Sequence, residues 1–123
     1  MNKYSISPEK VLQCLRDICL SLPETRETIK WGNPSFDAGK TTFAVLDKYD
    51  GKHCIAFRAG TDAHGELLAD SRFFPAPYAS KHGWICLDAG KRFTLRELRK
   101  LLTNSYRSVA IKRMLDALDS VPV

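Results

Sequence analysis

The sequence predicts a small α+β domain: an antiparallel sheet of about four to six strands, with one N-terminal helix and two C-terminal helices packed on it. Apolar residues recur at helical spacing near both ends of the chain, and strand-like runs lie between them. The links between these runs are too short for parallel crossovers. At 123 residues the chain can bury a core without disulfide or metal support, so one domain over residues 1–123 is expected.

The first helix is expected over Pro8–Leu22. Ser7 offers a hydroxyl cap, proline suits the first helical position, and Glu9 lies beside the positive end of the helix dipole. An apolar stripe follows at three- and four-residue steps, formed by Val11, Leu12, Leu15, Ile18, Cys19 and Leu22. Pro23 then ends the helix, and the stripe must pack on a sheet.

Three strand-like runs follow, over Thr25–Trp31, Thr41–Asp47 and Lys52–Arg58. Turns are expected between them, a proline turn at Asn33–Ser35 and a glycine turn at Asp37–Lys40. The Asp50-Gly51 pair is a strong hairpin signal between two apolar runs. The central part of the chain therefore predicts an antiparallel meander.

The second half begins with less regular structure. A short helix is expected over Ala63–Ser71, then an extended, proline-fixed segment over Phe73–Tyr78 and a further strand over Trp84–Leu87.

Two helices are expected to close the chain. Thr94 and Glu97 have the spacing of a capping box, which indicates a helix start. Asn104-Ser105 is expected to break this helix, and Tyr106–Leu118 to form the last one.

The four cysteines, Cys14, Cys19, Cys54 and Cys86, match neither metal nor redox spacing. Each lies in an apolar run, where a free thiol packs as a small hydrophobe. We expect four reduced, mostly buried thiols.

No residue pattern predicts catalysis or a cofactor. His53 and Cys54 are adjacent in a strand and point to opposite faces, while Cys86, four residues after His82, lies in an apolar run that keeps a thiol protonated. A zinc site built from His53, His64, His82 and Cys86 would lack paired ligand spacing. The glycines form no phosphate-binding cluster. Together with the missing catalytic pair and the missing metal-ligand spacing, this predicts no enzyme, no cofactor and no metal.

The net charge of +5 is concentrated near the C-terminus, where residues 91–113 contain eight basic side chains and one acid, Glu97. If the helix from Thr94 continues far enough, one broad stripe holds Arg96, Arg99, Lys100, Thr103 and Arg107. Such a stripe could neutralise phosphates along a nucleic-acid duplex. The other interpretation is a charged helix face that only keeps the protein soluble.

No apolar run reaches the roughly 18 to 20 residues of a membrane span, and charges interrupt any signal-peptide core. We expect a cytoplasmic protein without a membrane partner, and a monomer by default.

Several motifs resemble the MmcQ/YjbR-like family. They are the WGNPSF motif of Trp31–Phe36, the GKTTFA motif of Gly39–Ala44, the PAPY motif of Pro75–Tyr78, Lys81, Trp84, and a Leu-rich segment that leads into Ser105-Tyr106. The resemblance runs from about Ser7 to Leu118. It implies a frataxin-like fold and DNA binding through a double-wing arrangement. The first helix carries only Glu9 and Asp17 as acids, so iron handling is not expected.

The residues that match the family each have two interpretations. We expect Trp31 and Trp84 to fill the core rather than stack on a base, and Lys81 to bond a backbone carbonyl rather than a ligand. In the alternative, Trp31, Tyr78, Lys81 and Trp84 line a groove near Phe73–Trp84.

Two functions remain open on the sequence. The first is a small non-enzymatic DNA-binding protein that contacts duplex phosphates through Arg96, Arg99, Lys100 and Arg107. The second is a module that binds a protein or small ligand in the groove near Phe73–Trp84.

Overall fold

The computed structural model describes residues 7–77 and 83–120, and of residues 61–64 the backbone alone. The strands are β1 (Thr25–Lys30), β2 (Asn33–Ala38), β3 (Thr41–Tyr49), β4 (Lys52–Arg58), β5 (Phe73–Pro75) and β6 (Trp84–Asp88). The helices are α1 (Pro8–Cys19), α2 (Gly60–Leu68), α3 (Leu95–Val109) and α4 (Lys112–Asp119).

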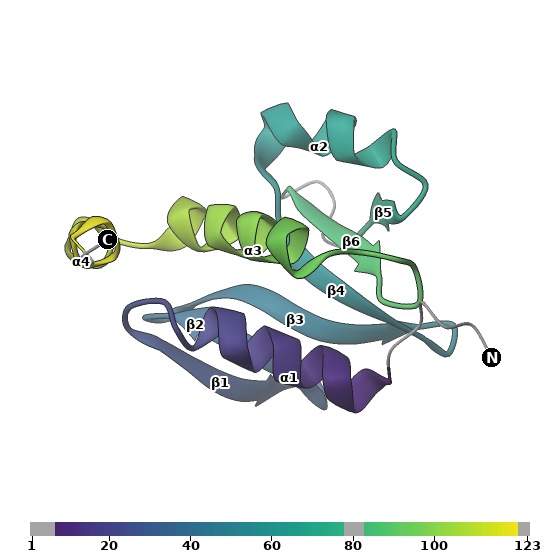
Figure 1. Cartoon of the computed structure of the whole chain (residues 1–123), viewed down its shortest axis with the longest axis horizontal. Coiled ribbons are helices and arrows are strands. Elements are labelled where there is room, and N and C mark those ends of the chain that lie inside the picture. The colour runs from purple at the N-terminus through teal and green to yellow at the C-terminus, as the bar shows by residue number, and fades with distance from the viewer. Residues whose placement is uncertain (1–6, 78–82, 121–123) are drawn as a thin grey trace.

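The six described strands form one antiparallel sheet in the order β1-β2-β3-β4-β6-β5. Helices α1 and α3 lie side by side against one face of this sheet, α2 lies near the β5 edge, and α4 lies at one end (Figure 1). The fold class expected from the sequence is confirmed. No helix of the described residues is both long enough and apolar enough to cross a membrane.

Helix α1 begins as expected and ends three residues early. The Ser7 side chain accepts a hydrogen bond from the Lys10 amide, and Pro8 takes the first turn. At the other end two hydroxyls bind the last carbonyls: Ser21 donates to Ile18 O at 2.6 Å and Thr25 donates to Cys19 O at 2.8 Å. These bonds replace the helical ones, so the chain leaves the helix before Leu22.

Residues 33–35 belong to β2, so the proline turn expected there is wrong. The turn lies at Trp31-Gly32, with φ of 55° and 79°, and the Lys30↔Asn33 pair closes it. Pro34 is tolerated in the strand because the ladder between β2 and β3 begins one residue later, at Ser35↔Val45. The Asp50-Gly51 hairpin is confirmed, with both residues at positive φ.

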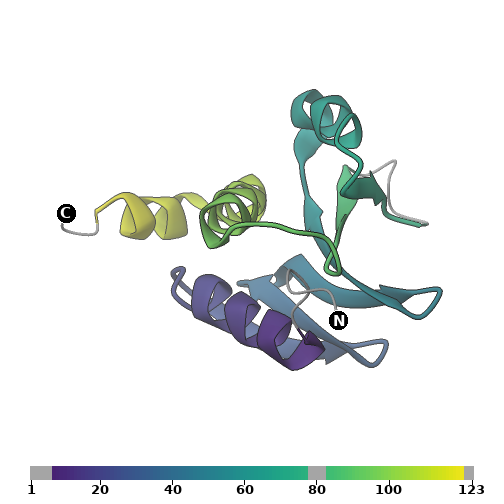
Figure 2. The same cartoon turned by 45° about the vertical axis from the view of Figure 1, so that its right-hand side comes forward.

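Both hairpin tips, between β1 and β2 and between β3 and β4, extend in the same direction, at the end of the sheet away from α4 (Figure 2). The core lies between the sheet and helices α1 and α3; its largest members are Phe36, Phe43, Phe57, Leu15, Ile55, Leu98, Leu102 and Tyr106. A second, smaller cluster lies on the opposite face of the sheet and consists of Cys54, Ala56, Ala76 and Cys86.

Helix α3 runs without interruption to Val109, so the break expected at Asn104-Ser105 is wrong. Ser105 is fully buried, and its hydroxyl donates to Phe43 O at 2.6 Å and accepts from the Arg58 amide at 2.9 Å. Ser105 therefore does not end the helix but joins α3 to β3 and β4. The real break is the extended backbone at Ala110 and Ile111.

We predict that Ser105→Ala lowers the free energy of unfolding by about 2 kcal/mol, because two buried backbone groups lose their partner. Ser108→Ala is the matched control: this serine is exposed on the same helix and bonds only Ser105 O. Urea unfolding should place the control within roughly 0.5 kcal/mol of the parent. Equal stability of both variants would contradict the role given to Ser105.

Candidate nucleic-acid interface

The continuous α3 places all four predicted phosphate-binding residues on one helix. The capping box is present: Glu97 N donates to the Thr94 hydroxyl at 3.0 Å, and Thr94 N donates back to Glu97 at 3.1 Å. Leu98 and Leu102 face the core and are fully buried. The opposite side of the helix is exposed and includes Arg96, Arg99, Lys100 and Arg107.

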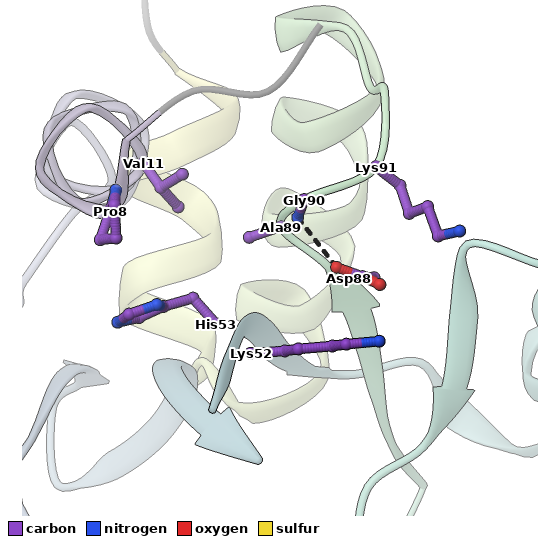
Figure 3. Close-up of a pocket in the computed structure, with 8 residues that line it drawn as sticks. All are labelled: Pro8, Val11, Lys52, His53, Asp88, Ala89, Gly90 and Lys91. Atoms are coloured by element: carbon purple, nitrogen blue, oxygen red, sulfur yellow. Dashed lines mark hydrogen bonds between the residues drawn. The ribbon is translucent and has the colours of Figure 1, made fainter. Parts of the chain in front are cut away.

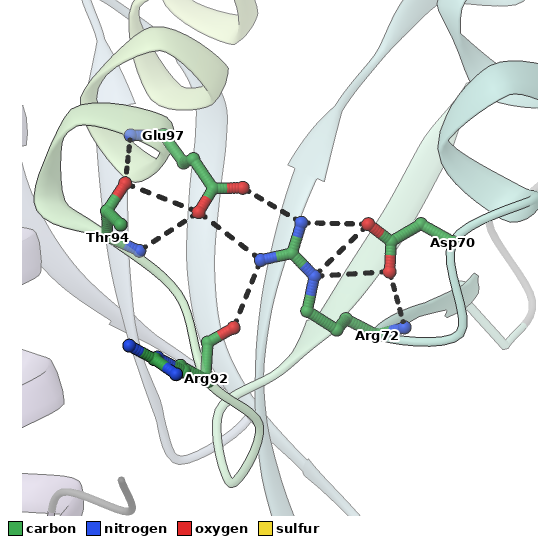
Figure 4. Close-up of polar contacts among 5 residues, drawn as sticks. All are labelled: Asp70, Arg72, Arg92, Thr94 and Glu97. Carbon is green, nitrogen blue, oxygen red and sulfur yellow. Dashed lines mark hydrogen bonds and ion pairs between the residues drawn. The ribbon is translucent and has the colours of Figure 1, made fainter.

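The one acid of α3, Glu97, forms an ion pair with Arg72, which also binds Asp70 (Figure 4). Arg72 lies between two carboxylates, 2.8 Å from Asp70 and 2.8 Å from Glu97, and also donates to Arg92 O at 3.0 Å. The hydrogen bond from Arg72 holds the pKa of Glu97 below its ordinary value despite partial burial. Because Arg72, in the turn just before β5, is shared between two carboxylates, it offsets the negative charge of α3 only in part.

The basic residues of the C-terminal region are not equally available. Arg96, Arg99 and Lys100 are exposed and form no ion pair with any of the described side chains, those of residues 7–60, 65–77 and 83–120. Arg107 is bound to Asp119 of α4 at 2.7 Å, and this hydrogen bond raises its pKa.

Two further cations of this region are also paired, Lys112 with Asp116 at 2.8 Å and Arg113 with Glu24 at 2.7 Å. Ion pairs within the fold therefore leave fewer cations available for a ligand than the sequence suggests. We call the set Arg96, Arg99 and Lys100 the basic face of α3.

The expected groove is not assembled from the residues that the structure describes. Phe73 packs on Phe57 in the main core, whereas Trp84 packs against the second cluster on the other face of the sheet. The Arg58 guanidinium lies over the Trp84 ring, 5.1 Å from its centroid. Tyr78 and Lys81 lie outside the described residues. Trp84 is therefore partly buried at the edge of the second cluster, with Arg58 over its ring, and does not fill the main core.

Trp31 does not fill the core, so that expectation is wrong. It lies at the tip of the first hairpin, and its residue surface is 100% exposed. The interpretation as a core residue assumed that the strand extends through Trp31, but the strand ends at Lys30.

A polar cluster on the helix-free face of the sheet was not predicted. The Asp37 carboxylate is buried and lies 2.7 Å from the Lys30 ammonium; Thr42 donates to it at 2.6 Å. Burial alone would raise the pKa of Asp37, but the hydrogen bonds from Lys30 and Thr42 outweigh it and lower that pKa. The sequence held one signal for this cluster, the strand alternation that places residues 35 and 37 on the same face.

A cavity of about 470 Å³ lies beside the start of α1, with Pro8, His53, Lys52 and Lys91 among its walls (Figure 3). In this view the two lysines lie on either side of the Asp88 carboxylate, which accepts a hydrogen bond from Gly90 N at 2.8 Å. The cavity mixes both charges and holds no catalytic pair.

Two of the cysteines, Cys19 and Cys54, are buried thiols with raised pKa values, which disfavours nucleophilic chemistry. Cys54 is buried, and its neighbour Cys86 together with burial raises the pKa of its thiol. Burial likewise raises the pKa of Cys19. His53 lines the cavity beside Pro8, on the other side of β4 from the second cluster that contains Cys54. Among the side chains of residues 7–60, 65–77 and 83–120, no three of His, Cys, Asp or Glu gather where they could hold a metal ion.

The strands and helices described above form an α+β domain with a six-stranded antiparallel sheet, and α3 carries the basic face on its exposed side. The family model described as YjbR matches residues 20–108, and the chain belongs to the YjbR family. The crystal structure of Deinococcus radiodurans protein DR2400, with a DUF419 domain, is similar at 20% identity and a TM-score of 0.73. That match covers 92% of this chain and 91% of the other, and it shows a shared fold. A search of curated proteins finds no match.

Proposed function

We propose that this protein binds duplex DNA through phosphate contacts made by the basic face of α3, and that it catalyses no reaction. The observation that carries the proposal is the availability of three cations on one rigid helix. Arg96, Arg99 and Lys100 are exposed and have no ion-pair partner in the described part of the chain. Guanidinium and ammonium groups so placed bind phosphate oxygens and release counterions.

The compensation of Glu97 strengthens this face. A carboxylate in the first turn of α3 would repel phosphates if it were free, but both of its oxygens bind Arg72 or the Thr94 cap. Arg72 is shared with Asp70, so these three groups keep one net negative charge, which the three cations of the basic face outnumber.

The contacts proposed here position DNA and do not read its sequence. Base recognition requires side chains that enter a groove, whereas the exposed residues of α3 are long cations suited to the backbone. The hairpin tips, which a double-wing arrangement would use, carry acids beside their lysines: Asp50 lies between Lys48 and Lys52. We therefore assign the phosphate contacts to α3.

The non-enzymatic part of the proposal is supported by protonated, buried thiols and by a mixed-charge cavity without a catalytic pair. The proposal also places the protein in the cytoplasm, where duplex DNA is accessible in cells that lack a nucleus.

Fluorescence anisotropy with two unrelated duplexes of equal length tests the proposal. We expect both to bind the parent protein with the same affinity, with a dissociation constant of about 10⁻⁶ to 10⁻⁴ M, as for other nonspecific binders. A strong preference for one duplex would show base readout and contradict the assignment. If neither duplex binds, the DNA proposal fails.

In that event the cavity of about 430 Å³ between α2, β5 and α3 is the next site to examine. Its walls include Phe73, Leu67 and Leu101 beside the Arg72 network. Because the donors of Arg72 are already bound by Asp70, Glu97 and Arg92 O, no observation at present favours a ligand there.

A further inference from the structure

Trp31 occupies a position that the fold itself does not require. Its residue surface is 100% exposed, and its φ of 55° is a conformation that bulky side chains rarely adopt. Asparagine, aspartate or glycine would normally stand at this position of a two-residue hairpin. Ile29, two residues earlier, is also 66% exposed. A strained backbone that presents a bare indole points to a contact outside the chain.

The tip that carries Trp31 is held rigidly. Lys30 and Asn33 are the pair that closes the turn, and each is bound to another strand. The Lys30 ammonium contacts Asp37 of β2 at 2.7 Å and also Thr42 of β3, and the Asn33 amide donates to Asp47 of β3 at 3.0 Å. Such preorganisation lowers the entropy lost when the indole docks.

A hollow of about 310 Å³ lies directly beside the tip. Gly32 and Asn33 form part of its wall, so it begins at the residue after Trp31. Its apolar walls come from Pro8, Leu12, Pro34 and Leu46. One acid and one base, Glu9 and Lys48, are also among the lining residues and are exposed.

We propose that two copies of this chain associate about a two-fold axis between the tip and the hollow, so that Trp31 of each copy enters the hollow of the other. The Trp31 side chain and the hollow are neighbours on one chain. A two-fold axis between them therefore places Trp31 of each copy at the hollow of the other. Glu9 and Lys48 line the same hollow, so this symmetry lets the acid of one copy pair with the base of the other, and we place Glu9 opposite the partner's Lys48.

The charges around the tip favour a second copy over nucleic acid. The Lys30 ammonium is compensated by Asp37, and the remaining charged neighbours are Glu9, Asp47 and Lys48. The tip therefore presents no net positive charge to phosphates, in contrast to the basic face of α3. That basic face would in turn repel another copy of itself.

The association should be weak. Two buried indoles account for roughly 300–500 Å² of surface and the walls that cover them for a similar area, so the total stays below the roughly 1,000 Å² of a lasting interface. We expect a reversible dimer that dissociates at low micromolar concentration and dominates near millimolar concentration.

Analytical ultracentrifugation without DNA tests the proposal across that range. The parent should show a monomer–dimer equilibrium, and Trp31→Ala should remain monomeric throughout. Ile111→Ala is the matched control, since Ile111 is an exposed apolar residue at the start of α4, 54% exposed, and its removal should leave the equilibrium unchanged. In a Trp84→Phe background Trp31 is the sole tryptophan, and its emission should shift to shorter wavelength as concentration rises.

A charge-swap mixture tests the arrangement itself. Glu9→Lys and Lys48→Glu should each weaken self-association, because each places like charges across both symmetric contacts. An equal mixture of the two variants should associate more strongly than either alone, since every contact then joins opposite charges.

Three results would overturn the proposal: a parent that stays monomeric at every concentration, a Trp31→Ala variant that dimerises like the parent, or a mixture that associates no better than its components. A monomeric parent whose DNA affinity depends on Trp31 would assign the tip to nucleic acid instead. The three measurements of self-association are valid whether or not α3 binds DNA.

Discussion

Asp37→Ala should lower the free energy of unfolding by about 3 kcal/mol, at the low end for breaking a buried ion pair. The Asp37 side chain is only 3% exposed, and its loss leaves the Lys30 ammonium and the Thr42 hydroxyl without their acceptor. Because the Lys30 side chain is 39% exposed, water can solvate part of the released charge, which keeps the loss moderate. Asp37→Asn keeps an acceptor oxygen and should cost roughly half as much.

The pH dependence follows from the direction of the pKa shift. The pKa of Asp37 is lower in the folded protein than in the unfolded chain, where it is about 3.9. Its contribution is therefore fully present above about pH 4 and is lost as the pH falls through the folded pKa. The difference in unfolding free energy between the parent and Asp37→Asn should be constant near neutrality and shrink below about pH 4.

Urea unfolding from pH 2 to 7 measures this difference, and the other paired acids cancel because parent and variant share them. A gap that widens on acidification would mean that Asp37 is protonated in the native state, contrary to the bonding described above.

Neutralising two residues of the basic face should nearly abolish DNA binding. Arg96→Gln with Lys100→Gln removes two of three phosphate contacts, and each contact contributes roughly 0.9 to the slope of log affinity against log salt. Affinity at about 0.1 M salt should fall roughly 60-fold, equally for unrelated duplexes, and the slope should flatten by about two units. Stability should change little because both side chains are exposed.

The matched control changes the same charge elsewhere. Lys40→Gln with Lys52→Gln neutralises two exposed lysines on the hairpins and should leave DNA affinity near that of the parent. If both double variants lose affinity alike, the effect is one of net charge and the basic face has no special role.

The ion pair between Arg107 and Asp119 supports a test in the opposite direction. Asp119→Asn releases Arg107 from its 2.7 Å partner and should add a fourth contact, which strengthens binding and steepens the salt slope by about one unit. Asp17→Asn is the control, because it removes the same charge from α1, where Asp17 accepts only from Gln13 and frees no cation. Equal gains in DNA affinity in both variants would show that the released Arg107 makes no contact with DNA.

Local chemistry made part of this fold predictable. The Ser7 and Thr94 caps, the proline at the start of α1 and the Asp50-Gly51 hairpin each depend on residues within a few positions of one another, and all are present. The failed predictions differ in origin: the first turn is local but lies at Trp31-Gly32 and not at Asn33–Ser35, whereas the role of Ser105 depends on a distant partner. Ser105 was read as a helix break because its acceptor, Phe43 O, lies 62 residues away in the sequence.

The candidate interface was also predictable only in part. Helical spacing was sufficient to place Arg96, Arg99, Lys100 and Arg107 on one exposed side of α3. Spacing could not reveal that Arg107 is held by Asp119 across a helix boundary, nor that Arg72, just before β5, pairs with Glu97. The sequence suggested four available cations, and the fold leaves three.

The slope of log affinity against log salt for the parent protein and an unrelated duplex tests the central claim most directly. Three phosphate contacts on the basic face predict a slope of about −3, measured by anisotropy between two or more salt concentrations. A slope near zero, or no binding at low salt, would contradict DNA binding by this face of α3.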